Sequence, residues 1–142
     1  MATIKLNDQT LRQITLFENI TNTTVKDCLE QSGTLYFIVD NGQLHKAVGR
    51  NGFNIKRLRE LLHKNIKVIE YSPKIEIFIR NIFREFPIKD ITIENSEDGK
   101  KKIAYVSVDI RDKGKIIGRE SRNLKIARAI IGRHEKIDIV IT

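Results

Sequence analysis

The stretch Val48-Gly49-Arg50-Asn51-Gly52-Phe53-Asn54-Ile55 places a short loop, bounded by glycines, between two segments of helical periodicity. Apolar residues lie three and four positions apart on both sides of the loop: Leu44, Ala47 and Val48 before it, and Ile55, Leu58, Leu61 and Leu62 after it. Glycine at both ends permits positive φ and a close approach of the backbone to a ligand, because no Cβ intervenes. We therefore predict two helices joined by a loop that can receive a ligand.

The surroundings of this loop favour an anion. The unpaired N–H groups and the positive dipole end of the second helix face whatever the loop holds. Basic side chains stand at the loop tip and beside it: Arg50, Lys46, Lys56 and Arg57. A phosphate backbone is the natural ligand for this arrangement. The alternative is structural, with Gly49 ending one helix, Gly52 starting the next and the basic side chains merely solvated; one short motif is a weak signal.

A second copy of the loop favours the functional interpretation. Sliding the sequence against itself by 69 residues without a gap aligns identical residues, among them Tyr36 with Tyr105, Lys46 with Lys115, Gly49 with Gly118, Arg50 with Arg119, Asn54 with Asn123, Lys56 with Lys125 and Lys67 with Lys136. Apolar positions follow the same register, including Val48 with Ile117, Ile55 with Leu124 and Val68 with Ile137. The chain is predicted to consist of two copies of one unit.

The repeated pattern, Val/Ile-Gly-x-x-Gly/Ser-x-Asn-Ile/Leu-Lys between two helices and before a short strand, resembles the KH RNA-binding domain. Two such units in tandem, each with an additional helix in front, are similar to the paired type II KH domains of the NusA family of transcription elongation and termination factors, and in particular to its short archaeal form. The resemblance covers nearly the whole chain. It implies an α+β fold of two tandem type II KH domains, residues 1–72 and 73–142, each a three-stranded mixed sheet packed with helices.

Caps, turns and periodicity predict the remaining elements of the first unit. Asn7 or Asp8 caps a helix that ends near Asn19, with an apolar stripe of Leu11, Ile14 and Phe17 in the core. A hairpin of residues 24–30 and 35–40 turns near Ser32-Gly33, and residues 66–70 form a third strand.

The second unit is predicted in the same way. Ser72-Pro73 caps a helix that runs to about Phe86, with an apolar face of Ile75, Phe78, Ile79, Ile82, Phe83 and Phe86. A hairpin of residues 88–94 and 102–109 turns at residues 96–99. After the second loop, Gly118-Arg119-Glu120-Ser121, we expect a helix from Arg122 to about Ile131 and a strand over residues 136–141.

The formal net charge of +8 is concentrated on the two loop regions. Residues 43–67 carry seven Lys/Arg against one acid, and residues 111–136 carry nine against three. Each region is therefore net +6, and the rest of the chain is net −4, which is the electrostatic footprint of a polyanion partner. The single cysteine, Cys28, excludes an internal disulfide and is expected to be a buried apolar residue. No apolar run reaches membrane-spanning length, so we expect a soluble, cytoplasmic protein without membrane contact.

In the KH mode the loop clamps the backbone of about four nucleotides of single-stranded RNA while the bases are read on their edges. The resemblance assigns RNA-binding roles in the first unit to Lys46, Val48, Gly49, Arg50, Asn51, Gly52, Ile55, Lys56 and Arg57. The corresponding residues of the second unit are Lys115, Ile117, Gly118, Arg119, Glu120, Ser121, Arg122 and Lys125. Val48, Ile55 and the strand ending in Val68 would supply apolar walls of the groove.

The second loop departs from the pattern at two positions. Ser121 replaces the last glycine; serine fits if its φ is negative, and its hydroxyl could then cap the next helix. Glu120 at the tip opposes a phosphate, although Arg119, Arg122 and Lys125 surround it in sequence. We expect the first loop to contribute more to RNA affinity than the second.

Other function classes fit the residues less well. The chain lacks a P-loop, a dinucleotide-binding glycine fingerprint, an HExxH motif and an evident nucleophile–base pair, so we expect no enzyme activity, no catalytic residue, no metal and no cofactor. Glu97-Asp98 is more simply a turn than a metal site, and His45, His63 and His134 lack ligand spacing. A ribosome-associated or ribosome-assembly KH protein and a single-stranded DNA-binding module remain alternatives. RNA polymerase contact rests on the resemblance alone, and a monomer is expected.

Overall fold

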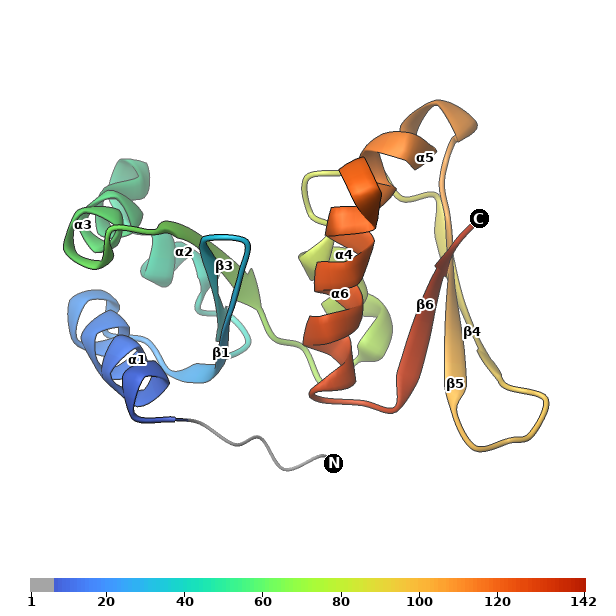
Figure 1. Cartoon of the computed structure of the whole chain (residues 1–142), viewed down its shortest axis with the longest axis horizontal. Helices are drawn as coiled ribbons and strands as arrows, with labels where there is room; N and C mark the ends of the chain where they lie inside the picture. The colour runs from blue at the N-terminus through green and yellow to red at the C-terminus, as the bar shows by residue number, and fades with distance from the viewer. Residues whose placement is uncertain (1–6) are drawn as a thin grey trace. The chain divides into compact units, whose positions relative to one another are not determined.

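A computed structural model describes residues 7–142, which form two compact units, residues 7–73 and residues 74–142 (Figure 1). Both units follow one order of elements: a helix, two strands, a short helix, a 3-10 turn, a longer helix and a last strand. In each three-stranded sheet the first two strands are antiparallel and the last two are parallel. The predicted α+β architecture of two mixed three-stranded sheets packed with helices is confirmed.

The first unit contains α1 (Asp8–Thr21), β1 (Val25–Gln31), β2 (Thr34–Val39), α2 (Leu44–Val48), the 3-10 turn η1 (Arg50–Gly52), α3 (Phe53–Leu62) and β3 (Asn65–Glu70). Asn7 is the residue that caps α1, because its Oδ1 accepts a hydrogen bond from the Thr10 N–H at 2.7 Å. The helix continues two residues beyond the predicted end at Asn19. Ser32 and Gly33 both have positive φ, as a two-residue hairpin turn requires.

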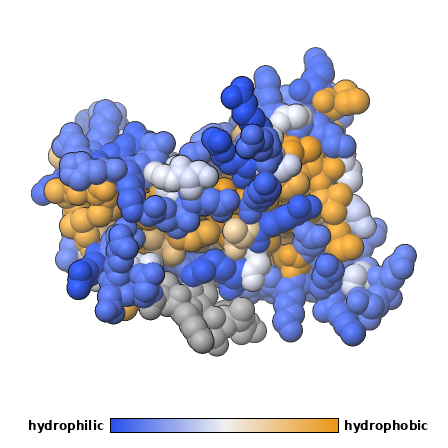
Figure 2. All heavy atoms as spheres, in the orientation of Figure 1, coloured by the Kyte–Doolittle hydropathy of each residue, from blue (hydrophilic) through white to orange (hydrophobic). Residues whose placement is uncertain are grey.

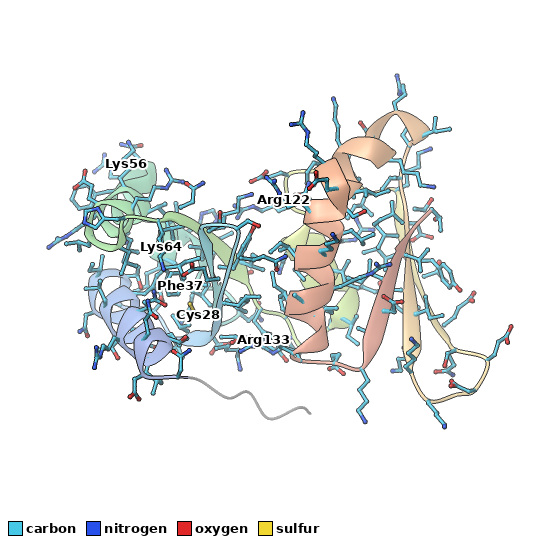
Figure 3. All side chains as sticks on the ribbon, viewed as in Figure 1. Cys28, Phe37, Lys56, Lys64, Arg122 and Arg133 are labelled. Carbon is cyan, nitrogen blue, oxygen red and sulfur yellow. The ribbon has the colours of Figure 1, made fainter. Side chains whose placement is uncertain are left out.

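The core of the first unit lies between its helices and one face of its sheet. Phe17 of α1 stacks on Phe37 of β2 with ring centroids 4.2 Å apart, and both side chains are fully buried. Cys28 is buried, as predicted, and lies with Phe37 on the inner side of the sheet (Figure 3). One predicted core position is wrong: Leu11 is 46% exposed, because it lies in the first turn of α1, before the buried residues. On α3, Leu61 shares the apolar spacing of Ile55 and Leu58 but lies in the last turn and is 49% exposed.

The second unit contains α4 (Ile75–Ile82), β4 (Asp90–Asn95), β5 (Lys102–Ser107), α5 (Ile110–Ile117), the 3-10 turn η2 (Arg119–Ser121), α6 (Arg122–Gly132) and β6 (Ile137–Ile141). Helices α4 and α6 lie on one face of the sheet (Figure 1). The predicted second hairpin, the helix after the loop and the closing strand are confirmed, and their ends differ from the prediction by no more than two residues.

The predicted helix from Ser72 to Phe86 is wrong at both ends. Lys74 is the N-cap residue of α4, and Ser72 is a buried residue upstream of it. The helix ends at Ile82, and a turn follows in which the Phe86 N–H bonds to the Phe83 carbonyl at 2.9 Å. Because Pro87 disfavours a helical conformation of the residue before it, the helix cannot be extended through Phe86.

The gap-free repeat fails at the last strand. Phe37 of β2 lies opposite Val68 of β3, whereas Val106, the counterpart of Phe37, lies opposite Ile141 rather than the predicted Ile137. In the second unit, the residue of the last strand that lies opposite this position is therefore four residues farther from the glycine loop than in the first unit. α6 is only one residue longer than α3, and the connection to the last strand lengthens from residues 63–64 to residues 133–136. An even offset keeps the same faces of the strand buried.

No helix within residues 7–142 is both long enough and apolar enough to cross a lipid bilayer.

We predict that Phe37→Ala destabilises the chain by about 3–5 kcal/mol, because it removes a fully buried ring and leaves a cavity against Phe17. Leu61→Ala is the matched control, since a half-exposed side chain is expected to cost less than about 1 kcal/mol. Urea denaturation followed by circular dichroism measures both. Equal losses of stability in the two variants would contradict the assigned core.

Candidate nucleic-acid interface

The two glycine loops have the same backbone conformation although their sequences differ. Gly49 has φ 81° and ψ 168°, and Gly118 has φ 82° and ψ 167°. At the next-but-one position, Asn51 has φ 54° and ψ 28°, and Glu120 has φ 56° and ψ 30°. The helices α3 and α6 start directly after these turns. The loops therefore present one geometry with two sets of side chains.

An asparagine behind each loop explains why its first residue is glycine. Asn54 Nδ2 donates to the Lys46 carbonyl at 3.2 Å, which ties α3 to α2 across the loop. A Cβ on Gly49 would lie 2.8 Å from Asn54 Cγ, which is a clash. The combination of φ and ψ at Gly49 is also one that essentially only glycine adopts.

The second unit has the same hydrogen bond and the same steric restriction on glycine. Asn123 Nδ2 donates to the Lys115 carbonyl at 3.1 Å, and a Cβ on Gly118 would lie 3.0 Å from Asn123 Cγ. The 69-residue repeat aligns the two asparagines, but no role is predicted for them from the sequence. The same residue type recurs at this position beside both loops, and this recurrence could have indicated a structural role.

The last loop residue is less constrained than the first. A Cβ on Gly52 would meet no atom within 4 Å, so a residue that tolerates the left-handed conformation fits there. Ser121 occupies this position with φ 60°, and its side chain makes no capping hydrogen bond. The negative φ and the capping role considered for Ser121 are therefore wrong. A capping serine has an extended backbone, which places its hydroxyl near the N–H groups of the second and third helical residues. The backbone of Ser121 is left-handed instead.

The basic side chains assigned to the site are all exposed and stand around the loops: Lys46, Arg50, Lys56 and Arg57 in the first unit, and Lys115, Arg119, Arg122 and Lys125 in the second. Lys56 and Arg122 extend outward near the starts of α3 and α6 (Figure 3), and hydrophilic surface covers the start of α6 (Figure 2). In the described residues Glu120 forms no ion pair with any of its basic neighbours. Its charge is not offset by a fixed partner.

The apolar residues assigned to the site lie behind the loops. Ile55 belongs to the buried core, and Val48 packs against that core. Their counterparts differ little, since Leu124 is buried and Ile117 is half-buried. These residues therefore support the loops from inside, while the charged and polar residues face solvent.

An open pocket of about 290 Å³ lies beside the first loop, lined by Arg50, Asn51, Phe53 and Lys56. The ring of Phe53 is 61% exposed. The sequence alone indicates no role for Phe53. The available signal was its position, because it follows the loop directly and does not share the spacing of Ile55, Leu58 and Leu62.

In the second unit Arg128 of α6 bridges to the outer edge of β6. The backbone groups of Lys136 and Thr142 form hydrogen bonds with β5. Along a strand, successive residues direct their N–H and C=O groups to opposite sides, so the N–H and C=O of Ile139 point to the free edge. The Arg128 guanidinium donates to the Ile139 carbonyl at 2.9 and 3.2 Å and pairs with Asp138 at 3.1 Å. The Asp138 carboxylate accepts the Ile139 N–H at 2.8 Å. Both edge groups of Ile139 are thus occupied.

The first unit leaves its edge open. The N–H groups of Asn65 and Tyr71 form hydrogen bonds on the β2 side. By the same alternation, the N–H and C=O of Val68 point to the free edge of β3. Among the described residues no side chain bonds to these groups, and Arg59, the counterpart of Arg128, makes no side-chain hydrogen bond or ion pair. The two units therefore differ at the strand edge as well as in the loop.

Comparison with known proteins places this geometry in a family. The KH domain family matches residues 12–85, which include most of the first unit and α4. A Methanocaldococcus jannaschii protein named "Probable transcription termination protein NusA" is 32% identical over 137 residues, covering 96% of this chain and 74% of the relative. A Halococcus morrhuae protein of the same name is 30% identical, covering 95% of both chains. This chain belongs to the archaeal NusA family of KH-domain proteins.

A solved structure has a similar fold over nearly the whole chain. The crystal structure of APE1850 superposes with a TM-score of 0.82 at 34% identity, covering 96% of this NusA-family chain and all of that one. The similarity extends over both units and not only over the part matched by the KH domain family.

The residues considered for other chemistries have structural explanations in this NusA-family chain. Asp98 accepts hydrogen bonds from the Ser96 hydroxyl and the Lys100 N–H, which hold the pKa of its carboxyl below the usual value. It is a turn residue. Within residues 7–142 no three His, Cys, Asp or Glu side chains are grouped as a metal site. His45 and His63 are exposed, and His134 is buried with its ring edge-on to Phe78.

We predict that Gly49→Ala destabilises the first unit by about 1–3 kcal/mol more than Gly52→Ser. The alanine would clash with Asn54 in a glycine-only conformation, whereas the serine reproduces the residue that the second loop carries in the same conformation. Urea denaturation of the two variants gives the comparison. If Gly52→Ser is the more damaging change, the proposed role of Asn54 in excluding a side chain at position 49 is wrong.

Proposed function

We propose that this chain is an RNA-binding transcription elongation and termination or antitermination factor, in which two type II KH domains, residues 1–72 and 73–142, clamp single-stranded RNA. The observation that carries the proposal is the duplicated loop, which has one backbone conformation in both units and exposed basic side chains at the start of the following helix. The names of the curated relatives support the role in transcription.

The second unit supports its assignment as a KH domain through topology. It repeats the order of elements, the strand order and the parallel pairing of the last two strands. Its loop has the positive φ values of the first loop and the corresponding hydrogen bond from the asparagine side chain to the lysine carbonyl. The KH domain family itself matches the first unit, so the second assignment is part of the proposal.

The geometry of the first loop suggests how RNA is held. A phosphate at Gly49–Gly52 would meet the unpaired N–H groups at the start of α3 and the positive end of its dipole. Arg50, Lys56 and the neighbouring Lys46 and Arg57 would neutralise the flanking phosphates. With about four nucleotides per KH loop, the two loops would hold about eight nucleotides plus any spacer, and weak single sites would gain from acting together.

The two units are proposed to contribute unequally. Unpaired Glu120 stands where Asn51 stands in the first loop, and like charge opposes a phosphate. Arg128 occupies the free edge of β6, whereas the edge of β3 at Val68 keeps its donor and acceptor available to base edges. The first unit is therefore the main site of affinity and of base contact.

The partners are proposed on the same basis. Single-stranded RNA is the ligand, RNA polymerase or the transcription complex is the site of action, and the protein acts as a cytoplasmic monomer without a cofactor or enzyme activity. A ribosome-associated KH protein would share this chemistry, and co-sedimentation with small ribosomal subunits rather than with polymerase would favour that alternative. Single-stranded DNA would serve as well as RNA unless the site contacts 2′-hydroxyls, which parallel titrations would show.

We predict that binding of a fluorescent single-stranded RNA octamer gives a log–log salt slope near −2 if about three phosphates are contacted, at about 0.7 per phosphate. Arg50→Gln should weaken binding and reduce the slope by about 0.7, because one phosphate contact is lost. Arg12→Gln removes the same charge from an exposed position on α1 and is the matched control. Equal effects of the two changes would indicate a diffuse basic surface instead of a clamp.

A reciprocal exchange tests the ranking of the loops. Glu120→Asn should tighten RNA binding, and Asn51→Glu should weaken it, each by about 1 kcal/mol, the energy of one charge pair at about 4 Å in water. The exchange is structurally matched because both positions share one backbone conformation. Fluorescence anisotropy at fixed salt measures both variants. Tighter binding by Asn51→Glu would show that the charge at this position does not face a phosphate.

A further inference from the structure

We propose that Phe53 is a stacking platform for an unpaired nucleobase of the strand held by the first loop. The inference rests on the proposed function and adds a contact that the glycine-loop clamp does not itself supply, because the loop holds the backbone and Phe53 would hold a base. It assigns a role to Phe53, the exposed aromatic residue among residues 7–142.

The environment of Phe53 is unlike that of the other phenylalanines. All six lie within the described residues; four are buried, Phe86 is half-buried, and Phe53 alone is exposed, at 61%. Ile55 and Leu58 carry the buried face of α3, so Phe53 contributes little to the core. Within residues 7–142 it stacks on no other ring. A ring that is more than half exposed and stacks on no other ring within residues 7–142 has no evident structural function.

The neighbours of Phe53 select the kind of ligand. Arg50 and Lys56 line the same open pocket of about 290 Å³, and both are exposed cations. Every nucleobase has a π face that can stack on an aromatic ring, and its strand carries a phosphate on each side for the two cations. Asn51, also in the pocket, offers an amide donor and acceptor to a base edge. A purely apolar protein partner would leave both cations unpaired.

The second unit lacks this feature. Arg122 takes the position of Phe53 at the start of α6, and no aromatic residue lies in the second loop. A guanidinium there contributes charge to the strand and less stacking surface than a ring. Base stacking is therefore expected at the first loop only.

The chain contains no tryptophan, so Phe53→Trp places a single tryptophan at the proposed platform. We expect its emission to be quenched when a single-stranded RNA octamer binds, and to change little with an abasic ribose-phosphate octamer of equal length. Leu61→Trp is the control, because position 61 is exposed on the same helix, eight residues and about 12 Å farther along it. Anisotropy of end-labelled octamers establishes that each strand is bound before emission is compared.

Affinity measurements on full-length variants complete the test. Phe53→Ala and Phe53→Leu should each weaken octamer binding by about 5- to 140-fold, the range reported for losing one base–aromatic stack, whereas Phe53→Tyr should bind like the parent chain. Leucine keeps the apolar character and removes the π face. Circular dichroism should be unchanged, because the ring is outside the core.

Three outcomes are distinguishable. Loss of affinity in the leucine variant with quenching at position 53 supports the platform. Parent-like binding by Phe53→Leu, or unquenched Phe53→Trp emission with the octamer bound, overturns the platform and leaves the clamp intact. If the parent chain binds no single-stranded RNA, the proposed function and the platform fail together.

Discussion

One hydrogen bond, from the Asn54 side chain to the Lys46 carbonyl, fixes the geometry on which the candidate site depends. It holds the start of α3 against the end of α2, and in doing so it fills the space where a side chain at position 49 would lie. Glycine is then obligatory, and its unusual backbone angles turn the loop so that the helix N-terminus and the basic side chains face solvent together. Asn123 does the same in the second unit.

The duplication separates what the backbone specifies from what the side chains specify. Both loops have the same φ and ψ values, although asparagine, glycine and phenylalanine in one become glutamate, serine and arginine in the other. The scaffold therefore preserves one loop conformation. The units differ instead in the exposed side chains of the loop and at the edge of the last strand, where Arg128 donates to the Ile139 carbonyl of β6.

Local signals in the sequence were sufficient for most of the fold. The loop, both hairpins and the last strands were predicted because glycine turns and apolar periodicity act over a few residues. The start of α4 was mispredicted because Ser72 is buried by tertiary packing, which overrides its capping preference. The four-residue offset of β6 was missed because similar residues, Ile137 and Ile141, recur along that strand. The Arg128 bridge joins residues ten positions apart on different elements, which no local pattern reveals.

The most direct test of the clamp is an amide chemical-shift map of the full chain titrated with a single-stranded RNA octamer. The account predicts the largest shifts at Gly49–Gly52 and the first turn of α3, and smaller shifts at Gly118–Ser121. The sheet face and α1 should change little. Shifts spread evenly over the basic surface, or confined to residues outside both loops, would contradict the assignment of the glycine loops as the RNA-binding sites.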